Sequence, residues 1–243
     1  MRVLLSGEGP TDLGCCTNAQ WCCEGPDFRI GPMTVLLAQA AELRLGYDLQ
    51  INPDGFMYVG ETELSAWAKD LPGRLRPTRG KRHGVETGYF FASAMALGKR
   101  ANDLGEQGQG PVLAVLFRDS DGTCSSPSTL WADKLQSMRD GFVYVECKTG
   151  VPMVPKPKSE AWLLCAAQTG LQNCEPLEDV SGNDASPNSA KAQLDAVFGE
   201  HKSGEELCDW LTDQPADLER LQTMPSFKAF LEDLVRALDH VVH

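Results

Sequence analysis

Apolar runs and helical periodicities alternate along the first two thirds of the chain. The run at residues 112–117 has no polar alternation, which is typical of a strand covered on both faces. Strands are predicted at residues 3–5, 56–59, 112–117 and 142–145. Apolar spacings of three and four predict helices at residues 32–45, 64–71, 86–104 and 126–138. The order β-α-β-α-β-α-β predicts an α/β fold: a Rossmann-like, mostly parallel sheet with helices on both faces.

The pattern changes after this core. Residues 151–155 predict a short edge strand, and Ser159 is expected to cap the helix that follows. The later apolar periodicities predict helices at residues 189–198, 205–211 and 225–242. We therefore expect an α/β domain at residues 1–172 with inserted loops at 13–31 and 72–84, a linker at 173–188, and a C-terminal helical appendage at 189–243.

Composition narrows the class of protein. The chain has 243 residues, of which 42% are hydrophobic and 23% are charged, as in ordinary globular proteins. It has no apolar run near the ~20 residues that a membrane helix needs, and no charged-then-apolar signal segment precedes the first strand. A cytoplasmic location without membrane association is expected.

Nine cysteines raise the question of disulfides or metal binding. For a chain of this size without an export signal, we expect reduced thiols. The pairs Cys15–Cys16 and Cys22–Cys23 form the one pattern that suggests zinc. Adjacent cysteines seldom converge on one tetrahedral ion, so a loop with incidental thiols is favoured.

Acidic residues follow two of the predicted strands directly. Glu8 comes after the first strand, and Asp119 and Asp121 come after the strand at 112–117. The carboxyl ends of parallel strands face the crevice in which open α/β sheets keep their sites. Clustered carboxylates repel each other unless a cation lies between them, and Mg²⁺ prefers oxygen ligands. The sequence therefore predicts a divalent-metal site at this edge.

The overall charge argues against a generally basic nucleic-acid-binding surface. The formal net charge is −12, whereas affinity for nucleic acid comes largely from Lys and Arg. One segment without acidic residues concentrates positive charge, and it is either a nucleic-acid contact or a solvated loop. Its candidate nucleic-acid-binding residues are Arg74, Arg76, Arg79, Lys81 and Arg82.

The motif Glu8-Gly9-Pro10-Thr11-Asp12, followed later by Asp119-Ser120-Asp121, resembles the TOPRIM domain of topoisomerases, primases and overcoming-lysogenisation-defect nucleases. The resemblance implies that Glu8 is a general acid or base or a metal ligand, and that Asp119 and Asp121 hold Mg²⁺ or Mn²⁺. Asp12 matches an acidic residue that the nuclease branch often carries four positions after the Glu. The implied activity is phosphodiester cleavage, with DNA favoured over RNA.

A second segment, Lys156-Pro157-Lys158-Ser159-Glu160, is similar to a feature of TOPRIM-like proteins found in phage-defence settings. That similarity implies that Lys156 or Lys158 neutralises a transition-state phosphate and that Glu160 completes a second metal position. The alternative is that Glu160 only begins a helix and that both lysines are solvated.

Two other functions remain open. Asp119-Ser120-Asp121-Gly122-Thr123 also resembles the first motif of haloacid-dehalogenase-type phosphatases, in which the first Asp is the nucleophile. That motif normally opens the fold, and the later acidic pair it requires could only be Glu178-Asp179, in polar sequence. Alternatively, the chain is a non-catalytic or conditionally active subunit that docks on a partner such as an ATPase through its helical tail, as its net acidity and the Phe- and Leu-lined last helix suggest, or it assembles as a homo-oligomer.

Overall fold

A computed structural model describes residues 1–9, 11–71, 87–121 and 129–242. Its main sheet has five strands in the order β3-β5-β1-β6-β7. The four parallel strands are β1 (Arg2–Gly7), β5 (Phe56–Gly60), β6 (Val112–Phe117) and β7 (Gly150–Met153). Strand β3 (Cys22–Glu24) pairs antiparallel with β5 at one edge. The expected α/β class with a mostly parallel sheet is confirmed.

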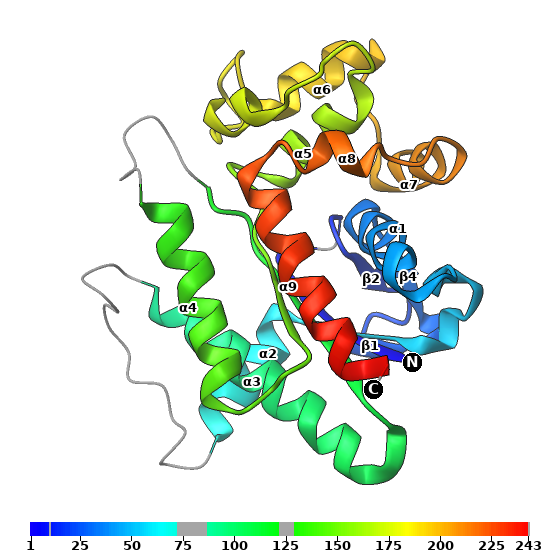
Figure 1. Ribbon diagram of the computed structural model, residues 1–243, viewed down its shortest axis with the longest axis vertical. Helices are drawn as coiled ribbons and strands as arrows, with labels where there is room; N and C mark the ends of the chain where they lie inside the picture. Colours follow the sequence, from blue (N-terminus) through cyan, green and yellow to red (C-terminus); the bar gives the residue numbers. More distant parts are fainter. Residues whose placement is uncertain (10, 72–86, 122–128, 243) are drawn as a thin grey trace.

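Helices cover both faces of this sheet, as Figure 1 shows. Val3 and Leu5 of β1 contribute to the core on one face, and Leu4 contributes to the core on the other. The first face is covered by α1 (Pro32–Leu45), α5 (Ser159–Ala167) and α9 (Pro225–Val242). The second is covered by α2 (Glu61–Asp70), α3 (Gly88–Leu104) and α4 (Leu130–Tyr144). Strands buried on both faces explain the uninterrupted apolar run of β6.

The chain leaves β1 and β6 toward opposite faces. After β1 it forms α1 on one face, and after β6 it forms α4 on the other, although β1 and β6 are hydrogen-bonded neighbours. Such a reversal between adjacent strands is the topological switch point, where open α/β sheets leave a crevice beyond the carboxyl ends of the strands.

The prediction of a strand at residues 142–145 is wrong. These residues continue and end α4, where buried Leu135, Met138 and Phe142 recur at helical spacing. Val143 is 75% exposed, which a central strand does not allow. The fourth parallel strand is β7, the segment expected to lie at an edge, and Phe142 packs closely against its Gly150.

The expected loop at residues 13–31 also contains regular structure. Besides β3 it forms a two-stranded sheet of β2 (Gly14–Cys16) and β4 (Phe28–Ile30). Disulfides Cys16–Cys23 and Cys165–Cys174 contradict the expectation of reduced thiols. With Cys16 and Cys23 joined, the four clustered cysteines do not form a zinc site as a set. Cys15 and Cys22 remain free.

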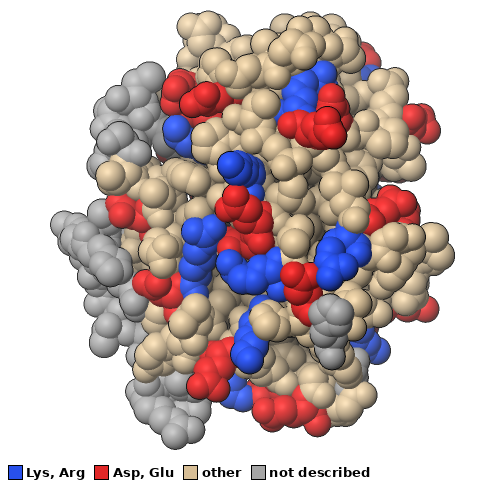
Figure 2. Space-filling model, in the orientation of Figure 1, with Lys and Arg blue, Asp and Glu red and all other residues tan. Residues whose placement is uncertain are grey.

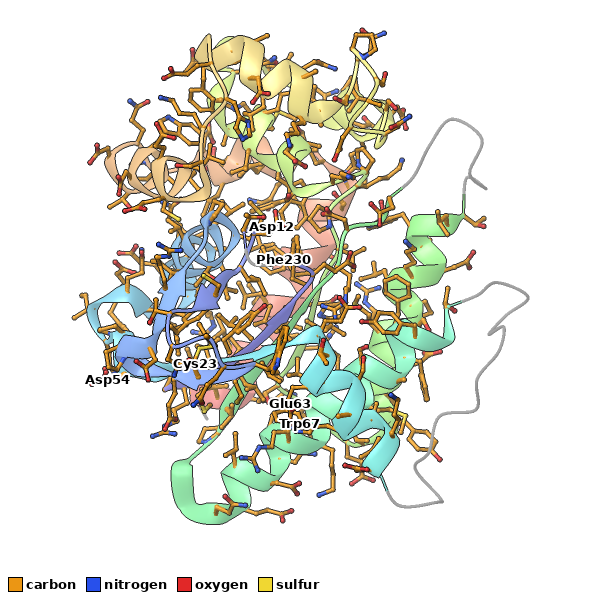
Figure 3. The ribbon with its side chains drawn as sticks, turned by 180° about the vertical axis from the view of Figure 1, so that it is seen from behind. Asp12, Cys23, Asp54, Glu63, Trp67 and Phe230 are labelled. Atoms are coloured by element: carbon orange, nitrogen blue, oxygen red, sulfur yellow. A yellow bond between two sulfur atoms is a disulfide. The ribbon has the colours of Figure 1, made fainter. Side chains whose placement is uncertain are left out.

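The C-terminal segments pack against the α/β core. Helices α6 (Ala190–Phe198), α7 (Gly204–Asp213) and α8 (Leu218–Leu221) precede α9. The apolar face of α9 is buried; Phe230, labelled in Figure 3, lies between α9 and the sheet. That face, which motivated the expectation of a docking partner, is therefore occupied within the chain.

Shorter helical segments connect these elements. The 3-10 helices are Gly25–Asp27, Leu49–Ile51, Pro53–Gly55 and Glu175–Asp179, the last within the expected linker, and α3 continues into a π-helical turn at Gly105–Gln109. None of the helices in the described ranges combines the length and apolar character needed to cross a bilayer.

Candidate functional site

The switch point between β1 and β6 carries a group of carboxylates, which we call the acid cluster: Glu8, Asp12, Asp119, Asp121 and Glu160. Glu8 follows β1, Asp119 and Asp121 follow β6, and Glu160 lies in the first turn of α5. Figure 3 shows Asp12 at the end of the sheet that faces helices α6 and α7. These are all five carboxylates that the sequence singled out.

Asp119 lies at the centre of this cluster. Its Oδ1 accepts a hydrogen bond from the backbone N–H of Ser159 at 2.9 Å, at the start of α5. Burial raises the pKa of Asp119 well above its usual value, and the neighbouring carboxylates of the cluster raise it further. The N-terminal end of a helix favours a negative charge, so the α5 amide partly offsets this repulsion.

Ser159 joins three members of the cluster. Its hydroxyl donates to Asp12 Oδ1 at 2.6 Å and lies 3.5 Å from Glu160 Oε2. Ser159 was expected to be the N-cap of α5, but it is the first residue of the helix, after Lys158. Its side chain is therefore available to Asp12. Burial is the main cause that raises the pKa of both Asp12 and Glu160.

Glu8 faces a buried arginine. Its Oε1 lies 3.7 Å from Nε of Arg118, whose side chain is 0% exposed. That Nε has no hydrogen-bond partner among the described residues, while the other guanidinium nitrogens donate to Phe117 O and to the Tyr89 hydroxyl. Burial raises the pKa of Glu8 to about 7; Arg118 opposes the rise, and Asp121 and Glu61 add to it.

Asp121 occupies the outer end of the post-strand segment. It is exposed and has a left-handed backbone (φ 51°), a conformation that Asp tolerates better than most residues. Its N–H donates to Pro157 O at 3.0 Å, which ties the segment to the chain beyond β7. Lys134 of α4 approaches from the other side, donating to Ser120 O at 2.7 Å. Burial lowers the pKa of Lys134, and Asp121, Glu8 and Asp119 oppose that change.

The two lysines predicted to act on phosphate lie at different places. Lys158 borders the acid cluster: its Nζ is 3.9 Å from Asp121 and 2.9 Å from Asp184. Lys156 pairs with Asp179 at 3.2 Å and with Glu178 at 3.9 Å, away from Asp119. The structure therefore brings Lys158 to the border of the cluster and leaves Lys156 outside it.

The basic segment cannot be placed, because Arg74, Arg76, Arg79, Lys81 and Arg82 lie outside the described residues. On the face in Figure 2, described Lys and Arg side chains alternate with Asp and Glu and form no continuous basic track.

The acid cluster suits a hard cation, although it is not a finished coordination shell. Within residues 1–9, 11–71, 87–121 and 129–242, no three His, Cys, Asp or Glu side chains converge closely enough to hold an ion by themselves. Mg²⁺ does not require three, since it commonly uses one or two carboxylates with waters and substrate phosphate. Burial, and to a smaller extent the neighbouring carboxylates, raise the pKa of Glu8 and Asp119, and a bound cation would favour their ionised forms.

Four further residues belong to the site but were not predicted. Glu61 directly follows β5, the same signal that identified Glu8, and its Oε1 accepts from the Tyr89 hydroxyl at 2.6 Å. Arg118 immediately precedes Asp119, but an arginine there gives no sign of burial. Tyr89 and Lys134 come from helices on one face of the sheet, and only the folded chain brings them near Glu8 and Asp119.

Comparisons with family models, with curated proteins and with solved structures each found no match for this chain. A function has to be inferred from the chemistry of the site.

Proposed function

We propose that this chain is a Mg²⁺- or Mn²⁺-dependent phosphoryl-transfer enzyme, and specifically a nuclease that hydrolyses nucleic-acid phosphodiesters. One observation carries the proposal: four carboxylates, those of Glu8, Asp12, Asp121 and Glu160, gather around Asp119 at the β1/β6 switch point, where burial and these neighbours raise its pKa. A purely structural role gives no reason to concentrate repelling charges at a site where most of them are partly buried.

Asp119 and Asp121, with Asp12 or Glu160 beside them, would hold the metal. A bound divalent ion polarises a phosphoryl oxygen and stabilises the charge that develops during displacement. The α5 amide and the Ser159 hydroxyl fix the orientation of Asp119 and Asp12. Their carboxylates are thereby held in place before any ligand arrives, which lowers the ordering cost of binding.

Glu8 is the proposed general acid or base. A carboxyl group with a pKa of about 7 can accept and release a proton at neutral pH, which an ordinary glutamate does poorly. The buried Arg118 positions Glu8. Its guanidinium is itself held by hydrogen bonds that it donates to Phe117 O and to the Tyr89 hydroxyl. Lys134 supplies positive charge on the α4 side of the same site.

The dehalogenase-type alternative receives less support. It needs a second acidic pair beside the first, but Glu178 Oε1 accepts from Ser226 N at 2.6 Å at the start of α9, and its other oxygen faces Lys156. Glu178 thus stabilises a helix end, a structural role.

Cleavage of single-stranded and duplex DNA and of RNA with Mg²⁺ or Mn²⁺ tests the proposal. Asp119→Asn and Glu8→Gln should each reduce the rate at least 100-fold while the circular dichroism spectrum is retained. Glu232→Gln, at an exposed acid on α9, is the matched control and should keep full activity. Undiminished metal-dependent cleavage by both site variants, or no cleavage of any substrate by the parent chain, would refute it.

A further inference from the structure

A pocket of about 360 Å³ opens directly beside the acid cluster. Asp12, Ser159 and Glu160 form one wall, so the pocket shares residues with the proposed metal site. Helix α6 and the start of α7 form the opposite wall. A ligand could therefore lie in this pocket and still place one of its groups against the acid cluster.

The lining combines an apolar part with polar and charged side chains. Leu163, Leu194 and Leu207 contribute buried apolar surface, and Phe198 lies among them, packed edge-on against Trp210 at 5.2 Å between ring centroids. Two lysines line the pocket: Lys202 pairs with Glu200 and Glu206, whereas Lys191 of α6 forms no ion pair or hydrogen bond through its side chain within the described ranges. In small-molecule sites, apolar side chains bury the ligand and polar groups fix its orientation, and this lining offers both.

We propose that this pocket binds one unpaired nucleotide of the substrate, next to the phosphodiester held at the acid cluster. The inference rests on the proposed nuclease function. The nucleobase would lie against the leucines and Phe198. Every type of base can pack on apolar and aromatic side chains, so this contact does not depend on the sequence of the nucleic acid. Lys191 would meet the negatively charged backbone beyond the base.

The size of the pocket sets the class of substrate. Its volume is near the lower end of the roughly 300–1,000 Å³ of ligand sites, enough for about one nucleotide. A base in a duplex is paired and stacked, and it reaches such a pocket only if it is first unpaired and unstacked, which costs free energy. The enzyme should therefore act on single strands or frayed ends in preference to intact duplex.

Binding is tested without metal, so that it does not depend on catalysis. Saturation-transfer NMR with deoxyadenosine in EDTA should detect binding to the full chain. Leu194→Trp, which fills the pocket, should weaken it at least tenfold, and Phe198→Ala, which removes the aromatic surface of the lining, is a second variant in case the first does not fold. Lys228→Glu, at an exposed lysine on α9, is the control.

Activity provides the second arm. A single-stranded oligonucleotide should be cleaved at least tenfold faster than a blunt duplex of the same sequence. Bis(p-nitrophenyl) phosphate, which has no base, serves as the reference substrate. The ratio of oligonucleotide cleavage to cleavage of this reference should fall at least fivefold in Lys191→Glu and should not fall in Lys228→Glu.

The two proposals fail in different ways. No deoxyadenosine binding, equal binding by Leu194→Trp, or equal cleavage of duplex and single strand would overturn the nucleotide pocket. If nothing is hydrolysed, including bis(p-nitrophenyl) phosphate, the nuclease function falls, and the NMR result alone decides whether the pocket binds a nucleoside.

Discussion

Replacing Glu8 with Gln should stabilise the metal-free protein while removing activity. The variant keeps the shape of the side chain and an oxygen that can face Arg118 Nε, but it removes the negative charge. A catalytic carboxylate that is partly buried and lies near other carboxylates makes the fold less stable than its neutral counterpart. Opposite effects on stability and activity at one residue would mark a functional site.

The magnitude follows from the pKa of Glu8. A rise from 4.5 to about 7 corresponds to at most about 3.5 kcal/mol, at roughly 1.4 kcal/mol per pH unit. The Glu8 side chain is 36% exposed, so solvent screening reduces the expected effect to roughly 1–2 kcal/mol.

The direction depends on pH. Between pH 4.5 and about 7, Glu8 holds its proton in the folded state and loses it in the unfolded state. The folded state therefore binds more protons, and its stability falls as pH rises through this window. Glu8→Gln lacks this loss, so it should match the parent chain near pH 4.5 and exceed it above pH 7.

Urea denaturation in EDTA at pH 4.5, 6 and 8.5 measures this difference. The advantage of Glu8→Gln should grow with pH and reach roughly 1–2 kcal/mol at pH 8.5, whereas Glu232→Gln should show no such trend. A variant that is less stable than the parent at pH 8.5, or whose advantage does not change with pH, would refute the electrostatic account of the acid cluster.

Three other changes test separate parts of the structure. Arg118→Gln removes the cation that lowers the pKa of Glu8, so the limb of the pH–rate profile that Glu8 sets, acidic for a general base and basic for a general acid, should move to higher pH; two unchanged limbs would contradict the assigned pairing. Glu178→Ala leaves the buried Ser226 N–H without its acceptor and should cost about 1–3 kcal/mol in urea denaturation. Metal binding should persist, and its loss would show that Glu178 does more than cap α9. Replacing both Cys16 and Cys23 with Ser should cost roughly 2–3 kcal/mol under non-reducing conditions, and no change would contradict this disulfide.

The sequence predicted the fold class and several elements because buried strands and amphipathic helices leave clear periodicities. Helix α1 spans residues 32–45 as expected, with Gly46 ending it in a left-handed conformation. The prediction of a strand at residues 142–145 was wrong because a short apolar run at the end of a helix resembles a buried strand. Strand β7 is only four residues long, and Pro152 within it weakens the strand signal.

The carboxylates of the site could be predicted, but their surroundings could not. Glu8 and Asp119 follow strands that the sequence marks, and parallel pairing of β1 with β6 brings those strand ends together. The places of Arg118, Tyr89 and Lys134 in the site depend on the direction of each side chain and on how α3 and α4 pack. A single sequence carries no periodic signal for either. The pocket beside Glu160 likewise depends on how α6 and α7 pack, and these helices are distant in sequence from the strand ends.

The central claim is that the acid cluster binds a divalent metal, and anomalous diffraction from crystals soaked in Mn²⁺ tests it most directly. We expect a peak about 2.0–2.3 Å from a carboxylate oxygen of Asp119, with Asp121, Asp12, Glu160 or Glu8 also in the coordination shell, and its absence in Asp119→Asn. A fully ordered acid cluster without a peak at saturating Mn²⁺, or manganese bound only elsewhere on the chain, would contradict the account.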